Sequence, residues 1–249
     1  MNYYEPFSEL NPHDATNRRI YGVSVGIVTN VNDPEKQGRV KLKLPLRECE
    51  NETDWVRIAS LMAASDLGAF FLPEVNDEVL VAFNEGNVRE PFVIGVLWNP
   101  KAKPPVYTVG EKVNIRKLKT RSGHEIVFTE ESGKEKIEIL TPGGHSLTMD
   151  DEAKKIELKN GTGNNNLVIE GQGNKISINS DQKILCKAQS SSVEIDSSGG
   201  ITIKSTGSIK IESSASLKIK GQQIDIEGQM LNLKGNGMVK INGSMVKIN

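Results

Sequence analysis

The sequence has little of what marks a disulfide-rich, membrane-spanning or nucleic-acid-binding protein. It contains two cysteines, Cys49 and Cys186, which lie far apart in no paired motif and indicate a reducing site of synthesis. Aromatic residues make up only 5% of the chain, which argues against several large compact cores. Lys and Arg number 31 and Asp and Glu 32, so the net charge of −1 carries no signature of nucleic-acid binding. No apolar run approaches membrane-spanning length, and the first residues lack the pattern of a signal peptide, which predicts cytoplasmic synthesis.

Residues that could carry chemistry are also sparse. The histidines His13, His124 and His145 do not form a pair at metal-ligand spacing. Carboxylates cluster at 130–131 and 150–152, and paired carboxylates can hydrolyse glycans. These clusters flank turns between short strands, so solvated turn acids are the favoured interpretation. We therefore predict no catalytic, cofactor or metal site, and a β-helical glycan-degrading tail protein is the alternative.

What the sequence does have is a repeat that fills its second half, from residue 122 to residue 249. Pairs of apolar residues separated by one polar residue recur there, from Ile126 and Phe128 to Val246 and Ile248. Their spacing shortens from about 11 to about 8 residues along the chain. Each unit has the period of a strand with one buried face, and Gly, Ser and Asn fill the gaps as turn residues. The sequence predicts strands of about five residues whose narrow apolar faces are buried only by stacking.

Two architectures satisfy this repeat. In one, three copies of the chain intertwine, and their strands form the sides of a triangular prism, a triple-stranded β-helix. In the other, a single chain coils alone. Units with only two inward residues favour the three-chain prism, in which neighbouring chains pair the open strand edges. The repeat alone leaves the single-chain coil open.

The first half has a different composition. Residues 1–20 are polar and irregular, with aromatic residues at Tyr3, Tyr4 and Phe7, and we interpret them as an N-terminal arm. Residues 21–99 predict five strands, at 21–31, 38–45, 54–58, 78–83 and 91–98, with one or two helical turns at 59–68. This is the plan of a small OB-fold barrel. Proline-containing residues 100–121 are expected to be a stiff linker.

An OB fold raises a second alternative function. OB-type nucleic-acid binders stack bases on exposed aromatic side chains in a basic groove. We place Trp55 and Trp98 in the apolar core of the predicted barrel, which argues against this alternative.

Several short motifs carry a resemblance to a known family, and their order along the chain makes it specific. The motifs are Asp33-Pro34, Gly38-Arg39-Val40, Trp55-Val56-Arg57, Phe71-Leu72-Pro73-Glu74, Asp77-Glu78-Val79-Leu80-Val81, Pro91-Phe92-Val93-Ile94-Gly95 and, before the repeat, Ser122-Gly123-His124-Glu125. With these motifs the chain resembles the central spikes of contractile tails, which include the phage baseplate assembly protein V, the VgrG spike of type VI secretion and the spikes of extracellular injection particles. One departure is Asn76, which stands where the family usually has Gly. Asn tolerates positive φ, so we expect the turn to survive.

The resemblance implies an all-β protein with a mechanical function. It implies a homotrimer that is made in a bacterial cytoplasm without a signal peptide and is assembled into a phage virion or injection particle. Its needle, roughly 70 Å long at about 4.8 Å per unit, would pierce a target envelope and contact the target membrane transiently. No enzymatic activity and no cofactor are expected, because residues 100–121 are too few for the lysozyme domain of some relatives.

The resemblance also implies two protein partners. A separate trimeric hub protein is expected at the OB collar, contacting Tyr3, Tyr4 and Phe7. A PAAR-type tip protein is expected on the last repeat units, where exposed strand edges and apolar side chains would otherwise face water. The expected tip interface consists of Met238, Val239, Ile241, Met245, Val246, Ile248 and Asn249.

Overall fold

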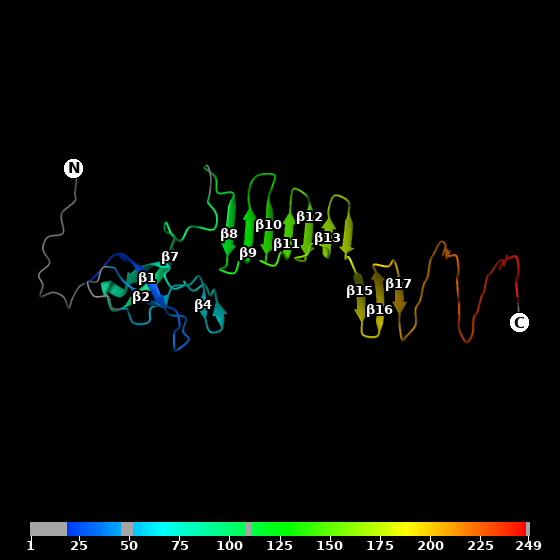
Figure 1. Cartoon of the computed structure of the whole chain (residues 1–249), viewed down its shortest axis with the longest axis horizontal. Coiled ribbons are helices and arrows are strands. Elements are labelled where there is room, and N and C mark those ends of the chain that lie inside the picture. Colours follow the sequence, from blue (N-terminus) through cyan, green and yellow to red (C-terminus); the bar gives the residue numbers. More distant parts are fainter. Residues whose placement is uncertain (1–18, 46–51, 108–110, 248–249) are drawn as a thin grey trace, which may run out of the picture. The chain divides into compact units, whose positions relative to one another are not determined.

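The protein is described by a computed structural model that covers residues 19–45, 52–107 and 111–247. The described residues are nearly all β, and their one helical element is a short 3-10 turn, η2 (Asn84–Gly86). This confirms the predicted all-β class. The chain divides into two compact units, residues 1–179 and 180–249 (Figure 1).

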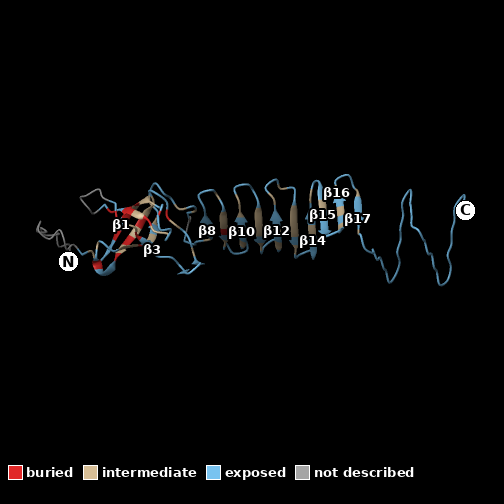
Figure 2. Cartoon of the chain, turned by 90° about the horizontal axis from the view of Figure 1, so that it is seen from below, coloured by how far each residue is buried: buried red, intermediate tan, exposed pale blue. Residues whose placement is uncertain are grey.

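A five-stranded sheet forms the barrel of the first unit. Its strands are β1 (Val23–Asn30), β2 (Lys41–Lys43), β3 (Arg57–Ile58), β6 (Glu78–Phe83) and β7 (Pro91–Leu97), in the order β2-β1-β6-β7-β3. A bridge between Val40 and Val56 joins the two ends of this order and closes the barrel. Alternate strand positions point inward and fill the core, which is the buried region of Figure 2. The core side chains include Val28, Val40, Leu42, Val79, Val81 and Val93.

Two local expectations for the barrel were wrong. Residues 59–68 do not form helical turns. Within them lie β4 (Ala63–Ala64) and β5 (Leu67–Gly68), which pair as an antiparallel hairpin. Trp98 is not a core residue, since its side chain is 71% exposed just after β7. Trp55 is half-buried, with the Lys41 ammonium 5.5 Å from its ring centroid.

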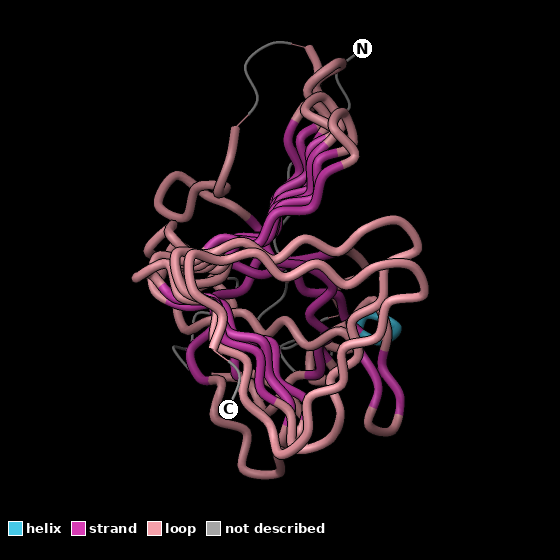
Figure 3. The backbone as a smooth tube through the Cα atoms, turned by 90° about the vertical axis from the view of Figure 1, so that its right-hand side faces the viewer, coloured by secondary structure: helices cyan, strands magenta, loops and turns pink. Residues whose placement is uncertain are grey.

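After the barrel, the first unit contains a seven-stranded antiparallel sheet, which we call the ladder. Consecutive strands pair in simple order, and seen end-on such strands lie one behind another (Figure 3). The first strand of the ladder, Ile115–Lys119, lies inside residues 100–121, which the sequence predicted to be a linker. These residues pair with the next strand and so belong to the sheet. The strands are β8 (Ile115–Lys119), β9 (Glu125–Thr129), β10 (Lys136–Leu140), β11 (Ser146–Asp150), β12 (Lys155–Lys159), β13 (Asn166–Glu170) and β14 (Lys175–Asn179).

The second unit begins with a three-stranded antiparallel sheet, β15 (Lys183–Ala188), β16 (Ser191–Asp196) and β17 (Ile201–Lys204). Residues 205–247 form no strand, although their apolar pairs predict several. All of the residues 206–247 are exposed (Figure 2). The single chain alone therefore does not form the strands that the apolar pairs predict for this segment.

Candidate functional site

The most unusual surface of the molecule is one face of the ladder. Paired positions of neighbouring strands share a face, so the strand registers align the apolar pairs into two continuous columns. Most of these side chains are between about a third and two thirds exposed in the single chain, from Met149 at 37% to Ile176 at 70%. The columns are Phe128-Ile137-Met149-Ile156-Ile169-Ile176 and Leu118-Ile126-Ile139-Leu147-Leu158-Leu167-Ile178.

The opposite face of the ladder is suited to water. Charged side chains alternate there and form ion pairs, such as Lys155 with Glu157 at 3.1 Å. Glu125 accepts hydrogen bonds from Lys117 and Lys119, and these interactions lower the pKa of its carboxyl group. One face is thus solvated and the other is apolar and uncovered, which marks the apolar face as an interaction surface.

The second unit repeats the two columns. One column runs through Ile184, Ile195 and Ile201, and the other through Cys186, Val193 and Ile203. Cys186 is a free, exposed thiol in the single chain. Its register places it in the same column as Val193 and Ile203, among apolar side chains.

The segment 205–247 has the same apolar pairs but no strand partner. No backbone-to-backbone hydrogen bond joins any of these described residues to the rest of the described chain. Ile209, Ile219 and Leu233 are 55%, 69% and 68% exposed. Extended backbone with a strand pattern and no internal partner is a template for pairing with other chains.

In the barrel, the Asp33-Pro34 and Gly38-Arg39-Val40 motifs form one structural device. The Asp33 side chain is only 3% exposed and accepts hydrogen bonds from Nε (2.9 Å) and Nη2 (2.8 Å) of Arg39. It also accepts from the backbone N–H groups of Glu35 (3.1 Å) and Gln37 (2.9 Å). The Arg39 guanidinium holds the pKa of the Asp33 carboxyl well below its usual range. The pair therefore fixes the loop that leads into β2.

Comparison with known proteins identifies the barrel. Residues 24–98 match the family model described as the type VI secretion system/phage-baseplate injector OB domain. Among the relatives, the actin cross-linking toxin VgrG1 of Vibrio cholerae is 30% identical over 112 residues, which are 41% of this chain and 10% of the relative. The spike protein VgrG2a of Pseudomonas aeruginosa is 29% identical over 125 residues, 44% of this chain and 15% of the relative. The barrel is an injector OB domain, and the chain is VgrG-like.

The VgrG-like chain spans less than a fifth of the length of these curated relatives. A third relative, the spike protein VgrG3 of Vibrio cholerae, is 28% identical over 108 residues, 40% of this chain and 11% of its own length. The family match confirms the OB-type domain, and the sheets that follow it agree with the predicted β-helix.

Residues 75–223, more than half of the chain, also match a family model described as the head GIN domain of a proposed auto-transporter adhesin. Over this stretch the chain belongs to that family as well. The match begins inside the barrel, before β6, and continues through the ladder and the three-stranded sheet. The matched range therefore corresponds to the series of short strands from β6 to β17. Its bounds do not coincide with those of a separate domain of this VgrG-like chain.

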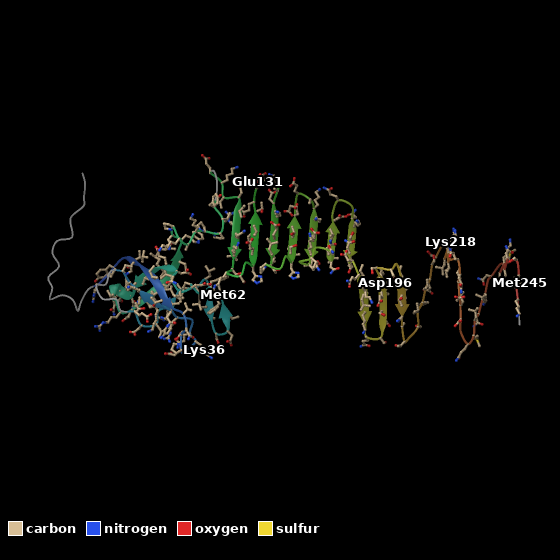
Figure 4. The ribbon with its side chains drawn as sticks, in the orientation of Figure 1. Lys36, Met62, Glu131, Asp196, Lys218 and Met245 are labelled. Carbon is tan, nitrogen blue, oxygen red and sulfur yellow. The ribbon has the colours of Figure 1, made fainter. Side chains whose placement is uncertain are left out.

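The predicted partner-binding residues fall at two places. Those of the tip interface that are described, Met238, Val239, Ile241, Met245 and Val246, are all more than half exposed. Met245, labelled in Figure 4, is 84% exposed. Ile248 and Asn249, and the hub residues Tyr3, Tyr4 and Phe7, lie outside the described residues.

The carboxylate and histidine groups considered from the sequence have ordinary structural partners. Glu131, labelled in Figure 4, pairs with Lys134 at 2.8 Å, and Asp150 accepts a hydrogen bond from the backbone N–H of Ala153 at 2.7 Å. His145 Nδ1 accepts from the backbone N–H of Gly161 at 3.0 Å. Within the described ranges, no group of three His, Cys, Asp or Glu residues is placed to hold a metal ion. Nor do those ranges contain a helix of the length and hydropathy needed to cross a bilayer.

Sequence reasoning missed one surface. The β4–β5 hairpin presents several large apolar side chains to solvent, among them Leu61, Met62 and Leu67. The signal was available, since apolar residues crowd residues 61–72 without the alternation of a buried strand.

Proposed function

We propose that this chain is the central spike of a contractile injection system or of a phage tail baseplate, and that it works as a homotrimer. The observation that carries the proposal is the pair of continuous apolar columns on one face of the ladder. A single sheet leaves these columns partly in water, and covering their exposed parts would contribute a share of the roughly 1.5–3 kcal/mol that full burial of each side chain yields. Three copies that turn this face inward would enclose a dry axial core and keep the charged face outside.

The two parts of the needle would be held together differently. In residues 115–204 each chain pairs its own strands, so three preformed faces pack against one another. Residues 205–247 have no backbone partner in the described chain, so their strands must pair with those of the other two copies. This intertwined part makes the needle stiff, and its chains must unwind together before they separate.

The remaining functional assignments rest on the family. The collar of three OB domains would sit on a trimeric hub protein, with Tyr3, Tyr4 and Phe7 in the contact. A PAAR-type tip protein would cover the exposed apolar side chains from Met238 onward. The relatives named as spike proteins support a mechanical, non-enzymatic function. The spike would be made in the bacterial cytoplasm, join a virion or injection particle, and contact a target membrane only on firing.

The experiment that tests the proposal is the molar mass of the whole chain in solution, measured by light scattering. We expect three times 27.3 kDa, unchanged on dilution. A mass of one chain would refute the trimer. The apolar columns would then need another partner, and the glycan-degrading and adhesin-like alternatives would be tested next by release of reducing sugar and by binding to cell surfaces.

A further inference from the structure

The β4–β5 hairpin of the OB domain carries a second uncovered apolar surface, far along the chain from the columns of the ladder. Leu61 is 96% exposed and Phe70 is 76% exposed. No strand or helix of the described chain covers them. We call this surface the hairpin patch, and it consists of Leu61, Met62, Leu67, Phe70 and Phe71.

The hairpin patch is held in place and is not a collapsed loop. Ser60 Oγ donates to the carbonyl oxygens of Ala69 (2.6 Å) and Met62 (3.1 Å), and the Ala69 N–H donates to the same Met62 oxygen at 3.0 Å. Gly68 closes the hairpin, because a Cβ there would lie 2.6 Å from Met62 O. The apolar side chains are thus presented to solvent by backbone that is already ordered, which lowers the entropic cost of binding.

A hollow of about 790 Å³ adjoins the hairpin patch. Its other wall is the Lys36–Gly38 loop, which the Asp33–Arg39 ion pair fixes, and a Cβ on Gly38 would meet the Phe70 ring at 3.5 Å. Lys36 and Met62, one from each wall, are labelled in Figure 4. Among the lining residues the charged side chains are Lys36 and Asp66, which have opposite signs. The surface therefore suits an apolar partner and does not repel a second copy of itself.

One contact ties this part of the barrel to the ladder. Glu74, just after the hairpin, accepts an ion-pair hydrogen bond from Arg121, in the turn between β8 and β9. The hairpin segment thus ends beside the start of the surface that we propose to bind two further copies. Residues 98–114 tether β7 to β8, so the proposed needle would hold three hairpin patches near one another and raise their effective concentration.

We propose that the hairpin patch packs against the neighbouring copy of this chain and locks the three OB domains into a closed collar. The inference rests on the proposed homotrimer, because it needs a neighbouring copy. In the proposed needle, the connector between β7 and β8 holds the hairpin patch of each chain near those of the other two copies, whereas the hub is a separate protein. We therefore assign a second copy, and not the hub, as the binding partner of the hairpin patch.

Photo-crosslinking tests this inference on the full chain. The photoreactive residue p-benzoylphenylalanine replaces Phe70 in one variant and Arg89, exposed between η2 and β7, in the matched control. Irradiation of the purified chain should give bands of two and three chains from the Phe70 variant, at least about tenfold more than from the Arg89 variant. A third variant with the same residue at Leu67, on β5, serves if the Phe70 variant fails to fold.

The outcomes separate this inference from the proposed function. A trimer by light scattering without cross-links between chains at positions 70 and 67 overturns the collar contact and leaves the trimer standing. A cross-link within one chain to residues 1–18, or cross-linking only to added hub protein, also overturns it and names the true occupant. A monomer by light scattering overturns both proposals.

Discussion

Replacing Ile156 by Ala gives the sharpest test of where the apolar face of the ladder lies. Ile156 belongs to the first apolar column, between Met149 and Ile169, and is 43% exposed in the single chain. If the chain works alone, this substitution trims a half-exposed side chain and costs about 0.5 kcal/mol or little more. If three copies turn the face inward, the same substitution opens a cavity in a buried core.

The two cases differ in magnitude. Truncating a buried Ile to Ala costs about 2–5 kcal/mol per side chain. Each trimer holds one such side chain per chain, and each separated chain loses only about 0.5 kcal/mol, so the trimer would lose about 4.5–13.5 kcal/mol relative to separated chains. Because 1.4 kcal/mol is a factor of about ten, the equilibrium constant for assembly should fall by at least about three powers of ten.

The assay is the urea concentration at which the trimer dissociates, measured by light scattering after the samples reach equilibrium. Glu157→Ala is the matched control, since Glu157 is adjacent on β12 but on the solvated face, where its pair with Lys155 contributes about 0–1 kcal/mol. The reasoning is refuted if Ile156→Ala and Glu157→Ala dissociate at the same urea concentration.

Three further predictions follow from single residues. In a Cys49→Ser chain, a maleimide should label Cys186 in urea but not in native buffer, because the proposed trimer would bury that column. Equal labelling under both conditions, read by mass spectrometry, contradicts this. Since Arg39 lowers the pKa of Asp33, the stabilisation from this pair is present above the unfolded pKa near 4 and is lost as pH falls through the folded pKa. Acid unfolding of the barrel, followed by tryptophan fluorescence, should therefore show this loss below about pH 4 in the native chain and not in Asp33→Asn. Asn76 has a φ of 76°, so Asn76→Val should destabilise the barrel by about 1–2 kcal/mol and Asn76→Gly should not, as thermal unfolding will show.

The barrel was readable from the sequence because its strands alternate and its motifs are local. The strands at 78–83 and 91–97 coincide with the predicted ones to within a residue, and Asn76 does adopt the positive φ expected of it. The misplaced features are those that depend on distant neighbours. Trp98 lies next to an apolar strand, yet nothing in the described fold covers it. The hairpin at 63–68 is made of helix-compatible alanines, and its pairing overrides that propensity.

In the second half, the sequence by itself determined the apolar pairs and the narrow apolar face of each strand. A period of two places both members of a pair on one side of a strand wherever that strand goes. It does not say which strand lies alongside, because that is decided by backbone hydrogen bonds between residues distant in the chain or in other copies. Only the tertiary structure decided that residues 115–204 pair within the chain while residues 205–247 find no backbone partner in it. The same pattern of apolar pairs thus occurs in residues with a partner strand in the chain and in residues without one. The reason is that the side chains decide which face can be buried, whereas backbone hydrogen bonds decide which strands pair.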